Sequence, residues 1–108
     1  MTPDIIQINN LQEYLITNPT ATYLVRVKGD SMKDSGILSG DILIIDRSIP
    51  MQNDSVIVAI LNNNFTIRRL IKREGRTYLL PDNDDYEIID VTDNPEYEEW
   101  GTVTYAIR

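Results

Sequence analysis

The chain has 108 residues, the size of one small domain, and 42% of them are hydrophobic, a fraction typical of globular proteins. It contains no cysteine and no histidine, which excludes disulfides, thiolate or histidine metal sites and serine–histidine triads. No apolar run is long enough to cross a bilayer, and Asp4 lies where a signal peptide would be basic. We therefore expect a single domain, residues 1–108, that is cytoplasmic and binds no metal, cofactor or membrane.

The net charge is −7, and the acidic residues are unevenly distributed. Nine of the seventeen lie between positions 82 and 99, with no lysine or arginine among them. Because neutralisation of phosphates supplies most non-specific affinity for nucleic acid, this charge argues against direct nucleic-acid binding. Five of the ten basic residues lie between positions 68 and 76, and we expect them on a solvated strand face. The acidic stretch is expected to be a solvated surface, and any partner that binds it should be basic.

One helix is expected early in the chain, over residues 9–16. Asn9 or Asn10 is a suitable N-cap, and Asn18-Pro19 ends the pattern. Three apolar residues share one face of this helix: Leu11, Tyr14 and Leu15.

After the helix, apolar and β-branched runs alternate with turn residues, which predicts strands. The expected strands are residues 21–27, 41–46, 55–61, 65–71, 77–80, 86–91 and 100–107. Seven strands at this spacing indicate an all-β sheet or barrel with one helix, in one domain. Trp100 and Tyr105 are expected in its core or at a dimer interface, with the core favoured, and Tyr97 in a solvated loop.

Residues 27–36 contain the clearest candidate for chemistry. Gly29 frees the backbone at the end of a strand, and Ser31 follows where the strand gives way to a turn. A serine there exposes its hydroxyl at a sheet edge, close to backbone N–H groups that can stabilise an oxyanion. Gly-Asp-Ser is also a common turn, and Ser31 can serve simply as a cap. From the pattern alone, the turn is the favoured interpretation.

A wider set of motifs resembles the LexA and UmuD family of self-cleaving serine peptidases. The motifs are Gly29-Asp30-Ser31-Met32, Asp34-Ser35-Gly36-Ile37, residues 39–46, Phe65-Thr66-Ile67-Arg68-Arg69-Leu70, Leu79-Leu80-Pro81-Asp82-Asn83 and Trp100-Gly101-Thr102-Val103. The start, residues 11–23, is more similar to UmuD than to LexA. The resemblance covers the chain from about residue 8 and implies a curved sheet or open barrel of about seven strands with one short N-terminal helix.

In that family a neutral lysine activates the serine. The resemblance places the serine on Ser31 and the lysine position on Arg68, with Gly29, Asp30 and Met32 lining the cleft. A guanidinium is in effect never deprotonated, and lowering its pKa to 7 would cost about 8 kcal/mol. Arg68 is therefore not a credible base, and Lys72 lies ~13 Å further along the strand.

We expect Arg68 to contact the Ser31 hydroxyl, a backbone carbonyl or a carboxylate, because an unpaired buried guanidinium is costly. The alternatives are that it turns to solvent, or that it is an engineered inactivating change. Family members cut themselves at a small-residue–Gly bond in an N-terminal arm. This chain has no Ala-Gly or Cys-Gly pair, and residues 1–8 are a short arm, so we expect the shortened, UmuD′-like form.

The resemblance implies an accessory subunit of the SOS response to DNA damage, with its peptidase chemistry lost. Such a subunit would homodimerise and bind a UmuC-like Y-family translesion polymerase and the RecA–single-strand filament. Two alternatives stay open: a residual serine peptidase that cleaves a partner in trans, and the dimerisation domain of a LexA- or phage-type repressor. Signal peptidase has a related fold, but the membrane anchor and the lysine are missing here.

Overall fold

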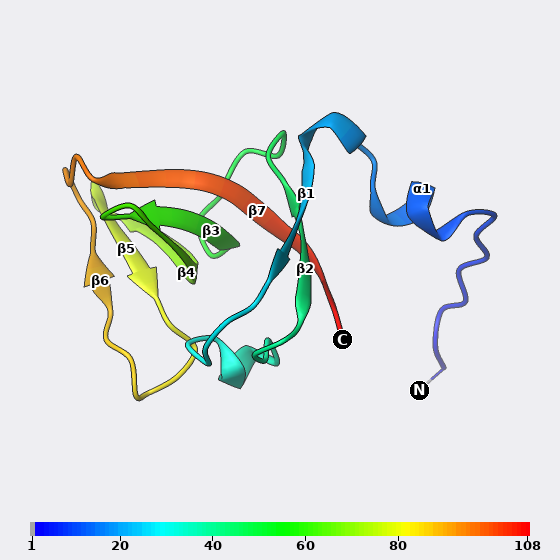
Figure 1. Ribbon diagram of the computed structural model, residues 1–108, viewed down its shortest axis with the longest axis horizontal. Coiled ribbons are helices and arrows are strands. Elements are labelled where there is room, and N and C mark those ends of the chain that lie inside the picture. Colours follow the sequence, from blue (N-terminus) through cyan, green and yellow to red (C-terminus); the bar gives the residue numbers. More distant parts are fainter. Residues whose placement is uncertain (1) are drawn as a thin grey trace.

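The computed structural model describes residues 2–108, and strands dominate it (Figure 1). One short helix, α1 (Leu11–Leu15), comes first, and two 3-10 turns, η1 (Pro19–Ala21) and η2 (Lys33–Ser35), lie in connections. The strands are β1 (Thr22–Arg26), β2 (Ile42–Asp46), β3 (Val56–Leu61), β4 (Asn64–Arg73), β5 (Arg76–Leu80), β6 (Ile89–Asp90) and β7 (Tyr97–Ile107). No helix within residues 2–108 is long and apolar enough to cross a membrane.

The strands form one antiparallel sheet in the order β1-β2-β7-β3-β4-β5-β6. The last strand of the chain lies at its centre, because the C-terminal half of β7 pairs with β2 and its N-terminal half with β3. Figure 1 shows β7 as a long curved strand that joins β1 and β2 to the group β3–β6. The predicted mainly β fold of seven strands with one short helix is confirmed.

Two register shifts accompany the curvature of β7. One lies between Ile44 and Ile45 of β2, and the other between Val58 and Ala59 of β3. An irregularity of this kind bends an antiparallel pair and increases its twist. Gly101 of β7 lies beside the second shift, and a Cβ atom there would stand 2.5 Å from Cγ2 of Ile45. Close packing at the bend therefore requires a residue without a side chain at position 101.

Apolar side chains pack on both faces of the sheet. The first cluster contains Val27, Met32, Ile37, Leu43, Ile45 and Val58. The second contains Ile57, Ala59, Leu70, Leu79 and Val91. Val58 belongs to the first cluster and its two neighbours to the second, because successive strand residues point to opposite faces. β3 is consequently buried on both sides, as its nearly continuous apolar sequence predicts.

The N-terminal helix is shorter than predicted and contributes nothing to the core. Asn10 caps it, since its side chain accepts a hydrogen bond from the Glu13 backbone N–H at 3.2 Å. No residue of α1 is buried, and Leu11 is 60% exposed. Figure 1 shows this segment projecting away from the sheet. A helix of five residues has little stability of its own, which explains why the pattern over residues 9–16 is only partly realised.

The C-terminal part differs from expectation in three places. β6 contains two residues instead of the predicted run 86–91, because the preceding segment is bonded to the turn after β1. β7 begins at Tyr97, whose ring packs against the second cluster, so its assignment to a solvated loop is wrong. Trp100 packs against the first cluster, as predicted, whereas Tyr105 is 40% exposed and does not belong to the core.

The acidic stretch and the basic cluster bind each other. Arg69 pairs with Asp82 at 2.9 Å, Lys72 with Glu99 at 3.2 Å and Arg76 with Asp90 at 2.5 Å. The basic residues that pair with these acids belong to β4 and β5 of the same sheet, so the basic nature of any external partner stays a prediction. The expected solvated face of residues 68–76 is therefore partly occupied by ion pairs.

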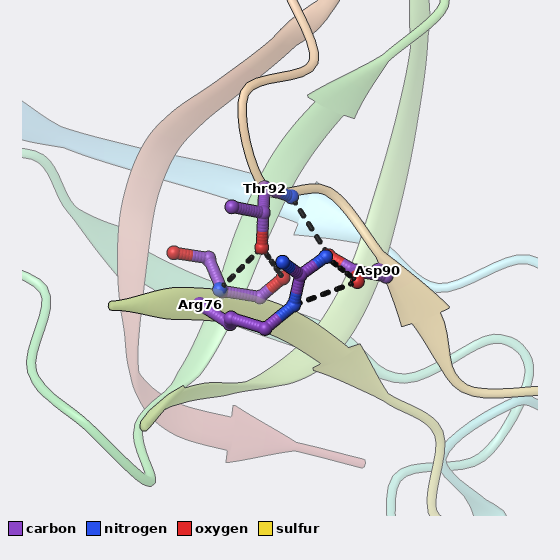
Figure 2. A network of polar contacts seen from close by, with 4 residues as sticks. Arg76, Asp90 and Thr92 are labelled. Atoms are coloured by element: carbon purple, nitrogen blue, oxygen red, sulfur yellow. Dashed lines mark hydrogen bonds and ion pairs between the residues drawn. The ribbon is translucent and has the colours of Figure 1, made fainter. Parts of the chain in front are cut away.

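Figure 2 shows the most connected of these pairs, where β5 meets the end of β6. Both Nε and Nη2 of Arg76 donate to Oδ2 of Asp90, at 3.2 and 2.5 Å. The Thr92 backbone N–H donates to Oδ1 of Asp90 at 3.0 Å, and Thr92 Oγ1 accepts from the Thr77 N–H at 2.8 Å. The Thr92 hydroxyl and Arg76 lower the pKa of Asp90 to about 2. The two-residue strand β6 is thus held to β5 by side chains as well as by its ladder.

Replacing Asp90 by Asn should lower the Tm at neutral pH, because it removes the ion pair that holds β6. A depressed carboxyl pKa stabilises the fold above the unfolded pKa of about 3.9 and loses this effect as pH falls toward about 2. The difference in Tm between parent and variant should therefore shrink across that range, as measured by circular dichroism. Asp84→Asn, at an exposed acid without an ion pair, is the control. A difference that stays constant with pH would contradict the assignment.

Truncating Leu79 should be severely destabilising, because the side chain is fully buried in the second cluster. Leu79→Ala is expected to cost about 2–5 kcal/mol in the free energy of unfolding, measured by urea titration. Ile88→Ala changes a side chain that is 64% exposed and should stay within about 0.5 kcal/mol of the parent. Equal effects for the two variants would show that the second cluster is not a core.

Candidate functional site

The turn after β1 positions Ser31. Gly40 N–H donates to the Val27 carbonyl at 2.9 Å, and Val27 N–H donates to the Asp41 carbonyl at 2.8 Å, so the turn is closed at its base. Gly29 then adopts φ +87°, a conformation that side chains rarely allow. The chain reverses there and leaves Ser31 half-buried at the start of the η2 region. Ser31 lies where the strand gives way to a turn, as predicted, but it is half-buried and its hydroxyl is bonded within the protein.

The segment after β5 supports this turn from the other side. Asp82 N–H donates to the Ser31 carbonyl at 2.9 Å, and Asp34 N–H donates to the Asp82 carbonyl at 2.8 Å. The buried Asn83 side chain adds a third bond, since its Nδ2 donates to the Asp30 carbonyl at 2.8 Å. Ser31 is therefore held by backbone bonds from a segment fifty residues further along the chain.

Arg68 of β4 contacts Ser31 directly. Nη1 of the guanidinium donates to Ser31 Oγ at 2.7 Å and to the Ile67 carbonyl at 2.8 Å. Ser31 Oγ also lies 3.4 Å from the same carbonyl oxygen, to which it donates a long hydrogen bond. Of the contacts expected for Arg68, the structure contains the hydroxyl and the backbone carbonyl, and no carboxylate.

The Arg68 guanidinium is only partly satisfied. Its Nε is buried and has no hydrogen-bond partner. Its Cζ atom lies 5.5 Å from the centre of the Tyr86 ring, a cation–π distance. Burial lowers the pKa of Arg68, and the nearby Tyr86 opposes that shift. The group still carries its charge at neutral pH, because arginine starts from a pKa above 12.

Tyr86 connects Arg68 to Asp30. Its hydroxyl donates to Oδ1 of Asp30 at 2.8 Å, and this hydrogen bond raises the pKa of Tyr86. The Asp30 carboxylate thus faces the phenol instead of the guanidinium. The Tyr86 ring and the Asp30 carboxylate both line the site.

These residues border a cleft of about 300 Å³. The end of β1 and the following turn form one side, β4 forms the other, and Tyr86 stands at the rim. Gly29, Asp30 and Met32 line the cleft, where the sequence analysis places them. Met32 is 2% exposed and belongs to the first core cluster, so it forms the floor.

The local chemistry around Ser31 is that of a hydrogen-bond acceptor facing a cation. Within residues 2–108, the side chain bonded to its oxygen is Arg68, a group that donates protons and does not accept them. Lys72 is engaged elsewhere, in its pair with Glu99. No neutral amine, carboxylate or imidazole within hydrogen-bond reach of Ser31 Oγ is present in this part of the chain. The geometry brings a serine hydroxyl and a guanidinium together, and within residues 2–108 no basic side chain that could accept the serine proton bonds to the hydroxyl.

Two residues of the site were missed at the level of sequence. The sequence pattern places Tyr86 at the start of a strand and Asn83 in a turn motif, whereas both side chains bond to Asp30. A tyrosine or asparagine in a polar loop gives no periodic signal. Both residues bond to Asp30, more than fifty positions earlier in the chain. The motif Leu79-Leu80-Pro81-Asp82-Asn83 was the available clue, because it placed a specific turn after β5.

No group of three or more acidic, histidine or cysteine side chains within residues 2–108 is arranged to hold a metal ion. Aspartates near the cleft are separated and occupied: Asp30 binds Tyr86, and Asp82 binds Arg69.

A mainly β sheet whose cleft sets a serine hydroxyl against a basic side chain has the architecture of the serine–lysine peptidases. Residues 4–104 match the family described as Peptidase S24-like, and the chain belongs to this family. The resemblance to the LexA and UmuD family that the motifs predict is confirmed.

Similar proteins include MucA proteins and LexA repressors. The chain is 42% identical over 99 residues to Protein MucA of Salmonella typhimurium and of Escherichia coli, covering 91% of the chain and 67% of MucA. It is 43% identical over 93 residues to the LexA repressor of Colwellia psychrerythraea, covering 84% of the chain and 44% of the repressor. For the LexA repressor of Hahella chejuensis the identity is 37% over 92 residues, which covers 81% of the chain and 46% of the repressor. The chain thus spans about two thirds of the MucA proteins and less than half of the LexA repressors.

Proposed function

We propose that this chain is a UmuD′-like accessory subunit of the SOS response whose serine–lysine dyad is inactive. In this proposal residues 1–108 act as one cytoplasmic domain that homodimerises and binds a UmuC-like Y-family polymerase and the RecA–single-strand filament. Ser31 occupies the nucleophile position and Arg68 the position of the general base.

The observation that carries the proposal is the 2.7 Å contact in which Arg68 Nη1 donates to Ser31 Oγ. A general base must accept the serine proton, and its pKa should lie near the working pH. Arg68 instead directs an N–H at the oxygen and stays charged. The hydroxyl is therefore held in place without being activated.

The choice of an SOS accessory subunit over a repressor rests on similarity. The 42% identity to MucA extends over 91% of the chain, a wider span than the LexA repressors cover. The start of the chain also resembles UmuD more than LexA. The dimerisation part of a LexA-type repressor is the second candidate, because the identity to those proteins reaches 43%.

The parent protein should show no peptidase activity. The test incubates it at mildly alkaline pH, with a RecA filament, and with a Peptidase S24-like protein that carries a cleavable arm but lacks its own serine. We expect the yield of fragments to equal that of Ser31→Ala, because no base is present to activate the hydroxyl. A cut that disappears in Ser31→Ala would overturn the inactive dyad.

Arg68→Lys should restore cleavage of the same arm. Burial lowers the pKa of a lysine amine, so a neutral base can form beside Ser31. The rate should rise with pH as the lysine loses its proton, and the double variant Ser31→Ala/Arg68→Lys should be inactive. Lys72→Arg is the matched control, because it changes a basic residue of the same strand outside the cleft. An inactive Arg68→Lys protein that folds normally would show that the cleft lacks more than its base.

Partner binding separates the two candidate functions. Co-purification with a UmuC-like polymerase should retain the chain, and light scattering should give the mass of a dimer at micromolar concentration. A stable dimer that does not co-purify with the polymerase would favour the dimerisation part of a repressor. A monomer under these conditions would contradict homodimerisation in either case.

A further inference from the structure

Two carboxylates within residues 2–108 are almost fully buried, and only one of them has a counter-charge. Asp41 and Asp46 are each 4% exposed. Arg108 forms an ion pair with Asp41 at 3.2 Å, which offsets the charge of that carboxylate. Asp46 forms no ion pair in the same part of the chain. Because a buried charge without a counter-charge is costly, a cation that reached Asp46 would be stabilised there.

Hydrogen bonds keep Asp46 ionised but do not neutralise it. The Ser48 backbone N–H and hydroxyl donate to Oδ1 at 2.8 and 2.6 Å, and Asn18 Nδ2 donates to Oδ2 at 3.1 Å. The bonds from Ser48 and then from Asn18 lower the pKa of Asp46, so the carboxylate is charged at neutral pH. A carboxylate has about four acceptor positions, which leaves Oδ2 able to accept a further donor.

Asp46 lines a second pocket, of about 300 Å³, that shares no residue with the cleft beside Ser31. Ile44 and Asp46 of β2 lie two positions apart, so their side chains point to the same face of the sheet. α1 contributes Tyr14 and Leu15 to the pocket, and β7 contributes residues 104 and 105. The buried carboxylate therefore borders a space between the N-terminal helix and the sheet.

The rest of the lining is apolar, aromatic or hydroxylic. Tyr14 and Tyr105 are 43% and 40% exposed and also line the pocket, and the face of an aromatic ring attracts ammonium groups. No lysine or arginine of the described residues lines the pocket. The apolar residues are Leu15, Ile44 and Ile49, and the hydroxyl groups belong to Thr17, Thr22 and Thr104.

This lining selects among cations. A divalent metal ion takes several oxygen ligands, whereas this pocket has one carboxylate, and no group of acids within residues 2–108 is arranged to hold a metal. An alkali ion would leave the apolar walls unused. An organic cation uses both parts of the pocket, and a volume of about 300 Å³ is at the lower end for ligand sites, so the group must be small.

We propose that this pocket binds a primary alkylammonium group on a short apolar stem. The ammonium donates to the Asp46 carboxylate, and the stem packs against Leu15, Ile49 and the tyrosine rings. A free small amine and the lysine side chain of a partner protein share this chemistry. The site is separate from Ser31, so the inference holds whether or not the dyad is active.

The test titrates isotope-labelled protein with n-butylamine and with n-butanol, followed by NMR. The two probes have the same carbon chain, and only the amine is charged. Butylammonium chloride replaces sodium chloride mole for mole, so the ionic strength stays constant. We expect the backbone amide signals of Thr17, Thr22 and Thr104 to shift. The amine should bind about tenfold or more tightly than the alcohol, because the alcohol lacks a charge-assisted hydrogen bond.

Asp46→Asn keeps the size of the side chain and removes its charge, so the affinity for the amine should fall to about that for the alcohol. Asp84→Asn removes an exposed acid outside the pocket and should leave the preference intact. If Asp46→Asn folds poorly, Tyr105→Ser keeps the test open, because it should weaken both probes. Tyr23→Ser, at a residue 45% exposed outside the pocket, should change neither.

Equal affinity for amine and alcohol in the parent protein would overturn the inference, as would a preference that survives in folded Asp46→Asn. The same loss of preference in Asp84→Asn would also overturn it, because the net charge and not the pocket would then attract the amine. None of these results bears on the proposed function.

Two further probes distinguish the sources of the ammonium group. Putrescine is a free diamine, and acetyl-Lys-methylamide is a capped lysine. Tighter binding of putrescine supports a free amine as the ligand, and tighter binding of the capped lysine supports a side chain of a partner protein. Failure of both to shift the pocket signals would overturn the inference.

Discussion

The curvature of the sheet is the constraint on which the site depends. β1 and β4 are separated by β2, β7 and β3, and four strand spacings in a flat sheet amount to about 19 Å. Ser31, just beyond β1, nevertheless lies 2.7 Å from Arg68 of β4. The bend of β7, with its two register shifts and the packing of Gly101 against Ile45, closes this distance. The cleft and the contact between the serine and the guanidinium both depend on that bend.

The distribution of charge follows from the same arrangement. β4 and β5 carry Arg69, Lys72 and Arg76 to positions where they meet acids of the stretch 82–99. These basic residues of β4 and β5 are therefore neutralised by ion pairs. Lys28 and Arg68 border the cleft and form no ion pair in the part of the chain that the structure describes. A chain that is strongly acidic overall thus has a locally positive site.

In the proposed function, an arginine at the lysine position changes what such a cleft can do. A lysine ammonium loses its proton readily when buried and then accepts one from serine. A guanidinium keeps its proton and offers several N–H donors in a fixed plane. In this chain Nη1 donates to Ser31 Oγ and to the Ile67 carbonyl, and the buried Nε has no hydrogen-bond partner.

Much of this protein was determined by local sequence. Apolar runs such as residues 56–61 predicted strands because a residue buried on both faces must be apolar, and Asn10 predicted a helix cap because its side chain accepts from the backbone. The motifs around Ser31 and Arg68 predicted two residues that the structure brings into contact. Sequence did not reveal that Tyr97 is a strand residue, that Tyr86 and Asn83 complete the site, or that the acidic stretch binds the chain's own arginines. These contacts join different strands and turns, some adjacent in the sheet and others more than fifty residues apart in the chain, and they form only when the strands have paired.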